Sequence, residues 1–231
     1  DEIVVVDGGS SDTTLKIAQK YKARIVQTDN PPIFHINKQK ALDICRGEWI
    51  LQLDADEVVT PELRDEILNI IRLSTFDFRL LTPNGYYIPR KNFFCGHWLR
   101  KGGQYPDYVI RLVRRGHAHF PSMSVHEQIA VDGSVEYLKN PLLHYSYDSI
   151  AEYWRKANAY ILLTAQEYKQ NKLPLNLFTY MEYNFYKPTV TFFSLFIRHK
   201  GFVDGYWGFL FAFFSALHHP LAYLRYGKST R

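Results

Sequence analysis

Hydrophobic residues in the first quarter of the chain gather in short runs that alternate with mixed stretches. The runs 3–6, 24–28 and 49–53 have the length and composition of strands. Helix-like stretches, one ending near Tyr21 and one over 38–46, lie between them. This alternation predicts a parallel, Rossmann-like sheet of an α/β protein. Because the chain opens directly on a strand, we expect the first strand of that sheet to be missing from this sequence.

The pattern changes after a predicted helix over 61–73. Four short runs separated by Gly, Pro and Asn read as strands of a mixed or antiparallel continuation of the sheet, at 86–94, 108–113, 125–131 and 142–147. Residues 150–170 have the apolar spacing of an amphipathic helix. We therefore expect one α/β domain over 1–148 and a helical extension over 149–231.

The tail of the extension is rich in aromatic residues. Residues 188–197 are uncharged, a polar turn follows, and 205–224 form an uncharged stretch long enough to span a bilayer. That stretch contains His218, His219 and Pro220, and the run before the turn is too short to span. We expect a helical pair, at about 188–226, that associates with a membrane surface. A true span and an intramolecular or dimer interface are the alternatives.

Composition narrows the possible partners. The chain has 231 residues, of which 46% are hydrophobic and 22% charged, so a folded core is expected. The net charge of +5 suits an anionic partner such as nucleotide phosphates or acidic lipid. No nucleic-acid-binding motif is present. Cys45 and Cys95 lack neighbouring cysteines at metal spacing, which indicates reduced residues in a cytosolic compartment.

Two turns carry the candidate chemistry. Asp54, Asp56 and Glu57 follow the run 49–53, and acids at the carboxyl end of a buried strand lie where open α/β sheets bind ligands. Two acids separated by one small residue can turn toward one cation. Asp7 ends the strand 3–6, and the crossover rule predicts that both turns share one sheet edge. The alternatives are a solvated acid pair and an Asp7 that only caps its Ser-rich turn.

These motifs resemble family 2 glycosyltransferases of the GT-A fold. The matching strings are Asp7-Gly8-Gly9-Ser10-Ser11-Asp12, Asp54-Ala55-Asp56-Glu57 and His126-Glu127. The chain is most similar to bacterial lipopolysaccharide core glycosyltransferases of the WaaE/LgtF type. That likeness extends over nearly the whole chain through strings in the same order, at 103–107, 111–112, 125–127, 144–145 and 201–205.

The resemblance implies an inverting transfer of a hexose from a nucleotide sugar, with UDP-glucose as the expected donor. It also implies a divalent metal, Mg²⁺ or Mn²⁺, and a glycan or lipid-linked acceptor of lipopolysaccharide core or related cell-envelope synthesis. The expected location is cytoplasmic, peripheral at the inner face of the cytoplasmic membrane. A sugar-phosphate nucleotidyltransferase and a non-catalytic glycan- or membrane-binding relative are the competing functions.

The resemblance also assigns roles to residues. Glu127 matches the catalytic base, although an exposed strand pair His126-Glu127 is the alternative. The residues implied at the nucleotide sugar are Asp7, Asp12, Lys38, Asp54, Gly102 and Gly103, and those implied at the metal are Asp54, Asp56 and His144. His144 has the alternative of an ordinary core histidine. Lys38-Gln39 stands where many relatives have Arg-Asn.

Overall fold

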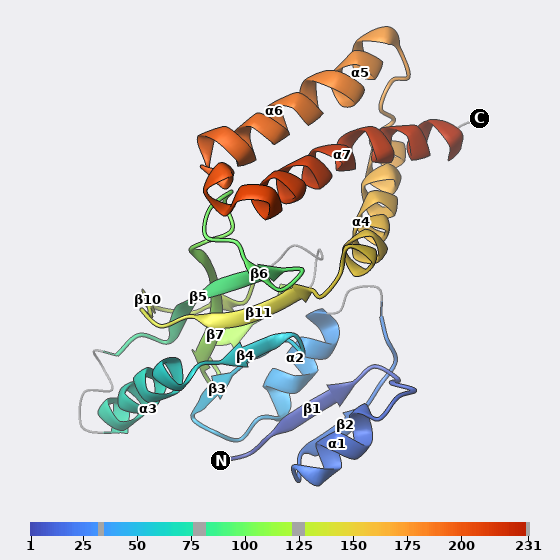
Figure 1. Cartoon of the computed structure of the whole chain (residues 1–231). Coiled ribbons are helices and arrows are strands. Elements are labelled where there is room, and N and C mark those ends of the chain that lie inside the picture. Colours follow the sequence, from blue (N-terminus) through green and yellow to red (C-terminus); the bar gives the residue numbers. More distant parts are fainter. Residues whose placement is uncertain (32–34, 76–81, 122–127, 230–231) are drawn as a thin grey trace. The chain divides into compact units, whose positions relative to one another are not determined.

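A computed structural model describes residues 1–31, 35–75, 82–121 and 128–229. The chain forms two compact units that interleave along the sequence (Figure 1). The first unit consists of Asp1–Ala55, Val59–Pro89 and Tyr108–Leu142, and the second of Asp56–Val58, Arg90–Asp107 and Leu143–Arg231. Neither compact unit is a single stretch of chain. The division into domains over 1–148 and 149–231 stays a prediction.

The start of the first unit has the predicted alternation of strands and helices. Its elements are β1 (Val4–Asp7), α1 (Thr14–Lys20), β2 (Arg24–Gln27), α2 (His35–Ile44) and β3 (Trp49–Leu51). β1 and β2 pair in parallel, with Val5 opposite Ile25, and α2 packs against β1. Within the described residues this ladder has two strands only, and β3 pairs with β7 instead. Hydrophobic runs predict that strands exist, but they do not name their partners.

The larger sheet is mixed, as the second part of the sequence predicts. Its strands are ordered β3, β7 (Asp107–Arg114), β5 (Gly85–Phe94), β11 (Leu142–Tyr147) and β4 (Glu57–Val59). Two short strands pair with β5: β10 (Val135–Tyr137) in parallel and β6 (His97–Trp98) antiparallel. β8 (Ala118–His119) and β9 (Ala130–Val131) form a separate antiparallel pair. Part of the strand predicted at 125–131 lies outside the described residues.

Helix α3 (Pro61–Thr75) and its surroundings show how apolar spacing builds the first unit. The Thr60 hydroxyl accepts a hydrogen bond from the Leu63 amide at 3.2 Å and so caps the helix, with Pro61 at its first position. The cluster that α3 joins is fully buried and contains Leu63, Ile67, Tyr86, Ile88, Leu112, Leu138 and Leu142. A second cluster packs α2 onto β3 and β7, with Leu42, Ile50, Ile110, Val113, Phe120 and Ile129.

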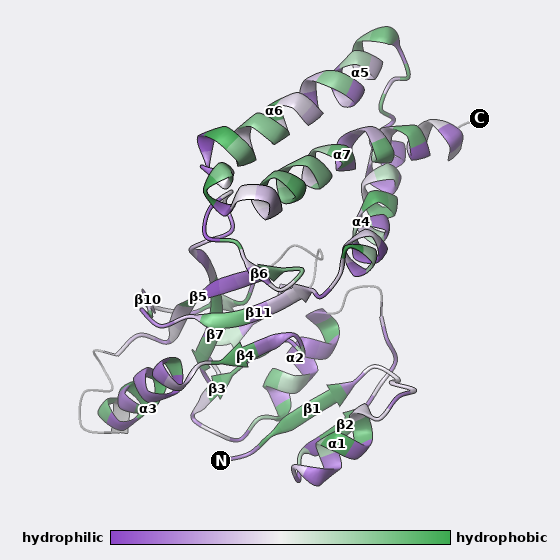
Figure 2. Cartoon of the chain, viewed as in Figure 1, coloured by the Kyte–Doolittle hydropathy of each residue, from purple (hydrophilic) through white to green (hydrophobic). Residues whose placement is uncertain are grey.

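The second unit contains the predicted aromatic-rich helices. They are α4 (Ile150–Gln170), α5 (Leu177–Met181), η1 (Glu182–Tyr186), α6 (Lys187–Phe193), η2 (Ser194–Arg198), η3 (Gly201–Asp204) and α7 (Gly205–Ser229). We call residues 177–229 the helical hairpin, because α6 and α7 run side by side and the turn at η3 joins them (Figure 1). Hydrophobic residues cover much of both arms (Figure 2). No helix among the described residues is long and apolar enough to cross a membrane.

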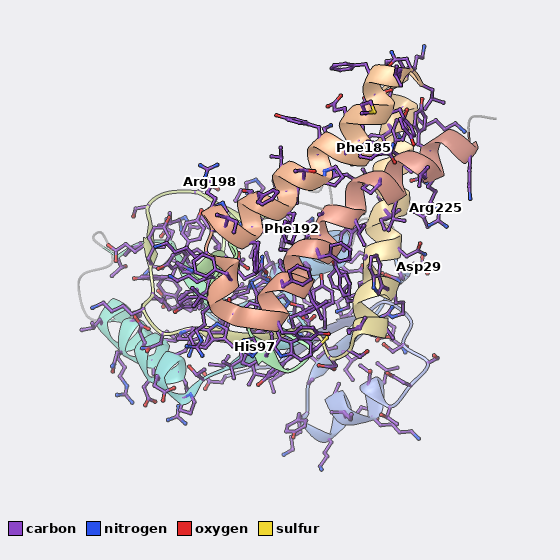
Figure 3. The ribbon with its side chains drawn as sticks, turned by 45° about the horizontal axis from the view of Figure 1, so that its top comes forward. Asp29, His97, Phe185, Phe192, Arg198 and Arg225 are labelled. Carbon is purple, nitrogen blue, oxygen red and sulfur yellow. The ribbon has the colours of Figure 1, made fainter. Side chains whose placement is uncertain are left out.

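Aromatic rings join the hairpin to the rest of its unit. The Phe94 ring, at the end of β5, makes edge-to-face contacts with Tyr153 of α4 and with Trp207 and Phe211 of α7. The centroid distances are 5.5, 6.1 and 5.7 Å. Between the two arms, Phe192 (Figure 3) meets Phe209 edge-on at 5.6 Å. Edge-to-face pairs of this kind favour a defined packing geometry over a merely apolar contact.

The turn of the hairpin depends on two glycines. A Cβ on Gly208 would lie 1.9 Å from the carbonyl oxygen of Gly201, and a Cβ on Gly201 would lie 2.7 Å from that of Leu195. Both clashes would be with backbone, which cannot rotate away as a side chain can. The close approach of η3 to the first turn of α7 therefore requires glycine at both positions.

We expect Gly208→Ala to lower the free energy of unfolding by roughly 1–3 kcal/mol, because the methyl group overpacks a backbone crossing. Gly227→Ala is the matched control: it lies in the same helix, and a Cβ there would meet nothing within 4 Å. Replacing a helical glycine by alanine should stabilise the protein by about 0.5–1 kcal/mol. Urea unfolding of both variants measures the difference, and equal stabilities would contradict the close crossing.

Candidate active site

Asp7 organises the turn that follows β1. Its carboxylate accepts hydrogen bonds from the amides of Gly9 and Ser10, each at 3.0 Å, and from the Ser10 hydroxyl at 2.5 Å. These bonds lower the pKa of Asp7, the Ser10 hydroxyl most. Asp12 accepts from the Thr14 amide at 2.9 Å at the start of α1. The structure thus shows the capping role of Asp7, and its predicted contact with the nucleotide stays a prediction.

Asp54, in the first unit, is held between two cations. Lys38 of α2 forms an ion pair with one carboxylate oxygen, and Arg111 of β7 donates to the other at 2.6 Å. Gln52 donates to Asp54 at 3.2 Å and accepts from the same guanidinium. Burial alone would raise the pKa of Asp54, but the charges of Arg111 and Lys38 outweigh it and lower the pKa to about 2. Asp54 is therefore a fixed, neutralised carboxylate.

The unit boundary passes between Ala55 and Asp56, so Asp56 has its own partners in the second unit. His144 of β11 places Nε2 at 3.6 Å from one oxygen of Asp56, and Lys156 of α4 places Nζ at 3.5 Å from the other. The Asp56 carbonyl accepts from the Tyr145 amide at 2.9 Å, which sets the register of the two side chains. His144 lowers the pKa of Asp56, burial opposes this, and Lys156 adds to the lowering.

Asn92 of β5 determines which nitrogen of His144 faces Asp56. The Asn92 amide nitrogen donates to the Gln104 carbonyl at 3.1 Å and to the Asp107 carboxylate at 3.0 Å. Both partners only accept hydrogen bonds, so the amide oxygen must be the atom that lies 2.6 Å from His144 Nδ1. An oxygen there places a proton on Nδ1, and Nε2 is the ring nitrogen that faces Asp56.

An imidazole nitrogen and a carboxylate that face each other can hold a divalent cation. A hydrogen-bonded acceptor on the far nitrogen, here Asn92, is the usual support of a histidine ligand. Within the described parts of the chain, no three His, Cys, Asp or Glu side chains gather at one possible metal site. Asp56 and His144 therefore suit a metal such as Mn²⁺ or Mg²⁺ that keeps its other positions for phosphate and water.

Gly102 and Gly103 form a tight loop in the second unit. Their φ angles are +64° and +74°, a region that favours glycine, and the Gly102 amide donates to the His199 carbonyl at 2.9 Å. Asp204, which is buried, accepts from the amides of Arg100 and Lys101 at 3.1 and 2.9 Å. The turn of the hairpin thus holds the loop in place. Asp204 makes the contact, a role that its position in the string 201–205 does not reveal.

Glu57 is not part of an exposed acidic turn. It begins β4, its side chain has no exposed surface, and it pairs with Arg90 at 3.3 Å. Arg90 also donates to Asp107 at 2.6 Å. Glu127 and His126 lie outside the described residues, so the position of the predicted base is untested.

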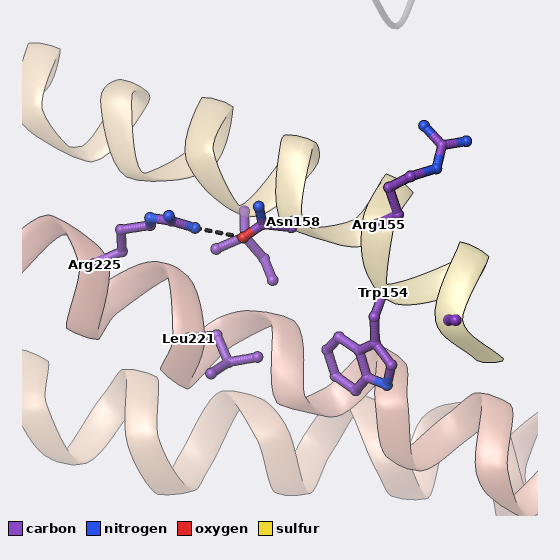
Figure 4. A pocket seen from close by; sticks show the side chains of 7 residues that line it. Trp154, Arg155, Asn158, Leu221 and Arg225 are labelled. Atoms are coloured by element: carbon purple, nitrogen blue, oxygen red, sulfur yellow. Dashed lines mark hydrogen bonds between the residues drawn. The ribbon is translucent and has the colours of Figure 1, made fainter.

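A cleft of about 480 Å³ lies between α4 and α7 in the second unit (Figure 4). Its lining consists of Ala151, Trp154, Arg155, Asn158, Ile161, Leu221 and Arg225. Arg225 donates to Asn158 at 2.5 Å (Figure 4). None of the residues that the resemblance implies lines this cleft, so it does not extend the candidate active site.

Comparisons with known proteins identify the family of the chain. A sequence model described as glycosyl transferase family 2 matches residues 1–112. An uncharacterized glycosyltransferase of Rickettsia bellii is 30% identical over 226 residues, 91% of this chain and 71% of the relative. The lipopolysaccharide core biosynthesis glycosyltransferase LpsC of Rhizobium meliloti is 28% identical over 242 residues, 93% of this chain and 81% of LpsC.

Solved structures show a weaker likeness. The crystal structure of S. aureus TarS 1–349 in complex with UDP has a TM-score of 0.46 and 16% identity, and the match covers 87% of this chain and 64% of TarS. The sequence model and the sequence relatives place the chain among the glycosyltransferases. It belongs to glycosyl transferase family 2.

The ion pairs of Asp54 predict a pH dependence of stability. A carboxyl whose folded pKa is about 2, against 3.8 in the unfolded chain, contributes stability above pH 4 that is lost as the pH falls toward 2. Asp54→Asn should therefore lower the free energy of unfolding by about 2 kcal/mol at pH 6, a difference that shrinks toward zero near pH 2. Urea unfolding between pH 2 and pH 6 measures it.

Asp65→Asn is the control for this series, because Asp65 is exposed and pairs with the exposed Arg64 at 2.8 Å. Its effect should stay within about 1 kcal/mol at every pH. A loss in Asp54→Asn that is the same at pH 6 and pH 2 would show that the charges of Lys38 and Arg111 do not stabilise this carboxylate.

Proposed function

We propose that this glycosyltransferase moves a hexose from a nucleotide sugar to a glycan or lipid-linked acceptor in lipopolysaccharide core or related cell-envelope synthesis. The observation that carries the proposal is the pair Asp56–His144, oriented by Asn92, in a chain of family 2. Similarity to LpsC supports the lipopolysaccharide acceptor, and UDP-glucose is the donor to test first.

In the proposed reaction the acceptor oxygen bonds to the anomeric carbon as the bond from that carbon to the diphosphate breaks. Glu127 takes the acceptor proton, the nucleoside diphosphate leaves, and the configuration inverts in this single displacement. Asp7, Asp12, Lys38, Asp54, Gly102 and Gly103 are the proposed donor contacts. General base catalysis of this kind contributes about 10²–10⁴-fold in rate.

Of the three metal candidates, Asp56 and His144 are favoured over Asp54. Both oxygens of Asp54 are engaged by Lys38 and Arg111, whereas one oxygen of Asp56 faces the imidazole of His144, with Nε2 at 3.6 Å. A Mg²⁺ or Mn²⁺ bound there would supply positive charge for the leaving diphosphate. Asp54 then has a positioning role, because its ion pairs hold the side chains of Lys38 and Arg111 in place.

We expect Asp56→Ala to abolish transfer and Glu127→Gln to reduce kcat by about 10²–10⁴-fold, since one loses the metal carboxylate and the other the base. Glu136→Gln makes the same chemical change at an exposed residue and should leave the rate unchanged. Product mass from a panel of nucleotide sugars, with Mn²⁺ or Mg²⁺ present, measures transfer and names the donor.

Several outcomes of this assay would contradict the proposal. A near-normal rate in Glu127→Gln would remove Glu127 as the base. Formation of a nucleotide sugar and pyrophosphate from a sugar phosphate would favour the nucleotidyltransferase alternative. Binding of donor without turnover of any acceptor or of water would favour a non-catalytic relative.

We also propose that the enzyme works at the cytoplasmic surface of a membrane, through the helical hairpin. Large apolar side chains are exposed along its first arm and its turn, among them Leu177, Phe178, Met181, Phe185, Val190, Phe193, Ile197, Phe202 and Val203. The exposed turn also carries Arg198 and Lys200. The two acids of the helical hairpin add little negative charge to this surface, because Glu182 pairs with Lys187 at 3.1 Å and Asp204 is buried. Such an apolar and basic surface suits anionic lipid.

Cosedimentation with phosphatidylglycerol vesicles tests this location. Phe185→Ser combined with Phe193→Ser should reduce the bound fraction on the order of 10-fold, because two exposed rings no longer leave water for the bilayer. Tyr21→Ser, at an exposed aromatic residue of the first unit, should have no effect. Phosphatidylcholine vesicles should bind less than phosphatidylglycerol vesicles. Unchanged binding in the double variant, or dimers that form without lipid, would contradict the proposal.

A further inference from the structure

Lys156 of α4 is anchored beside Asp56 by several groups. Its ammonium nitrogen donates to the Ser146 carbonyl at 2.8 Å and lies 3.5 Å from Asp56 Oδ2 and 3.7 Å from Glu152 Oε1. The ring of Tyr147 lies below it, with 5.6 Å between Nζ and the centroid. Less than a third of the Lys156 side chain is exposed. The ammonium group is therefore held in place rather than extended into solvent.

Each oxygen of Asp56 has a different neighbour. Oδ1 faces His144 at 3.6 Å, and Oδ2 faces Lys156 at 3.5 Å. The first neighbour is an imidazole nitrogen, which can bind a metal in its neutral form. The second is a cation and cannot do so. A divalent metal on Asp56 and the ammonium of Lys156 would thus compete for the same carboxylate.

We propose that Lys156 is the resident cation of Asp56, which a divalent metal must displace, so that Lys156 limits the metal affinity of the site. This inference rests on the proposed function of Asp56 as a metal ligand. Lys156 keeps two anchors when it is displaced, the Ser146 carbonyl and Glu152, one turn before it on the same helix. The lysine therefore lowers the affinity for metal without having to leave the site.

The coulombic interaction predicts the size of the effect. Two like charges a few ångströms apart near a protein surface repel by an energy that changes an equilibrium constant about 10-fold or more, after allowance for solvent screening. Removing the ammonium should therefore tighten binding of Mn²⁺ on the order of 10-fold. A lysine that merely supported the fold would have the opposite effect, because its loss would leave Asp56 less well placed.

The test is titration of the full chain with Mn²⁺ alone, followed by the electron paramagnetic resonance signal of the free ion. We expect Lys156→Gln to bind Mn²⁺ about 10-fold more tightly than the wild type, and Lys156→Arg to bind like the wild type. Arg155→Gln is the matched control, since it removes the neighbouring positive charge of α4, whose ion pair is with Glu152 at 3.5 Å and not with Asp56. Its affinity should change less than about 2-fold.

Asp56→Asn separates a failure of the proposed metal site from a failure of the proposed role of Lys156. Loss of Mn²⁺ binding in Asp56→Asn, together with unchanged or weaker binding in Lys156→Gln, overturns the role of Lys156 and leaves the metal site in place. Unchanged Mn²⁺ binding in Asp56→Asn overturns both. Equal tightening in Lys156→Gln and Arg155→Gln also overturns the proposal, because it would reflect net charge and not the contact with Asp56. Far-ultraviolet circular dichroism confirms that each variant is folded.

Discussion

A carboxylate that leaves bulk water must gain a positive partner or a set of donors, and this requirement governs the structure around the strand ends. Asp54 has Lys38 and Arg111 in the first unit. In the second unit Arg90 pairs with both Glu57 and Asp107, and the buried Asp204 is satisfied by the amides of Arg100 and Lys101. Removing any one of these partners would leave a charge in a poorly solvated place, so each pair holds two elements together.

The same pairs give the candidate site its orientation. Arg90 holds Asp107, Asp107 holds the amide nitrogen of Asn92, and the amide oxygen of Asn92 then faces His144 Nδ1. Each step leaves the next group one orientation only, because a carboxylate cannot donate and a guanidinium cannot accept. A chain of this kind transmits order from a structural ion pair to a candidate ligand, which is why the supporting residues matter as much as the carboxylate itself.

The sequence predicts local structure better than it predicts partners. The helix Ile150–Gln170 has the bounds expected from its apolar spacing, and strands β5, β7 and β11 lie within a residue or two of the runs that indicate them. The burial of Glu57 was not visible beside Asp54 and Asp56, because β4 is only three residues long and too short for periodicity to show. The pairing of β3 with β7 was likewise not visible, since register depends on long-range contacts. Asn92 and Lys156 were missed for the same reason: they lie 52 and 100 residues from His144 and Asp56.

The two acids of the Asp-x-Asp motif are alike in sequence and differ in their cations. Asp54 faces a guanidinium that is itself almost fully buried and bonded to Gln52, and such a planar, multiply bonded group does not yield its carboxylate easily. Asp56 faces an ammonium on a flexible stem, which has further partners, and an imidazole nitrogen at 3.6 Å. The motif therefore contains one acid fixed between two cations and one acid that faces an ammonium and an imidazole, a distinction that resides in their partners and not in the aspartates.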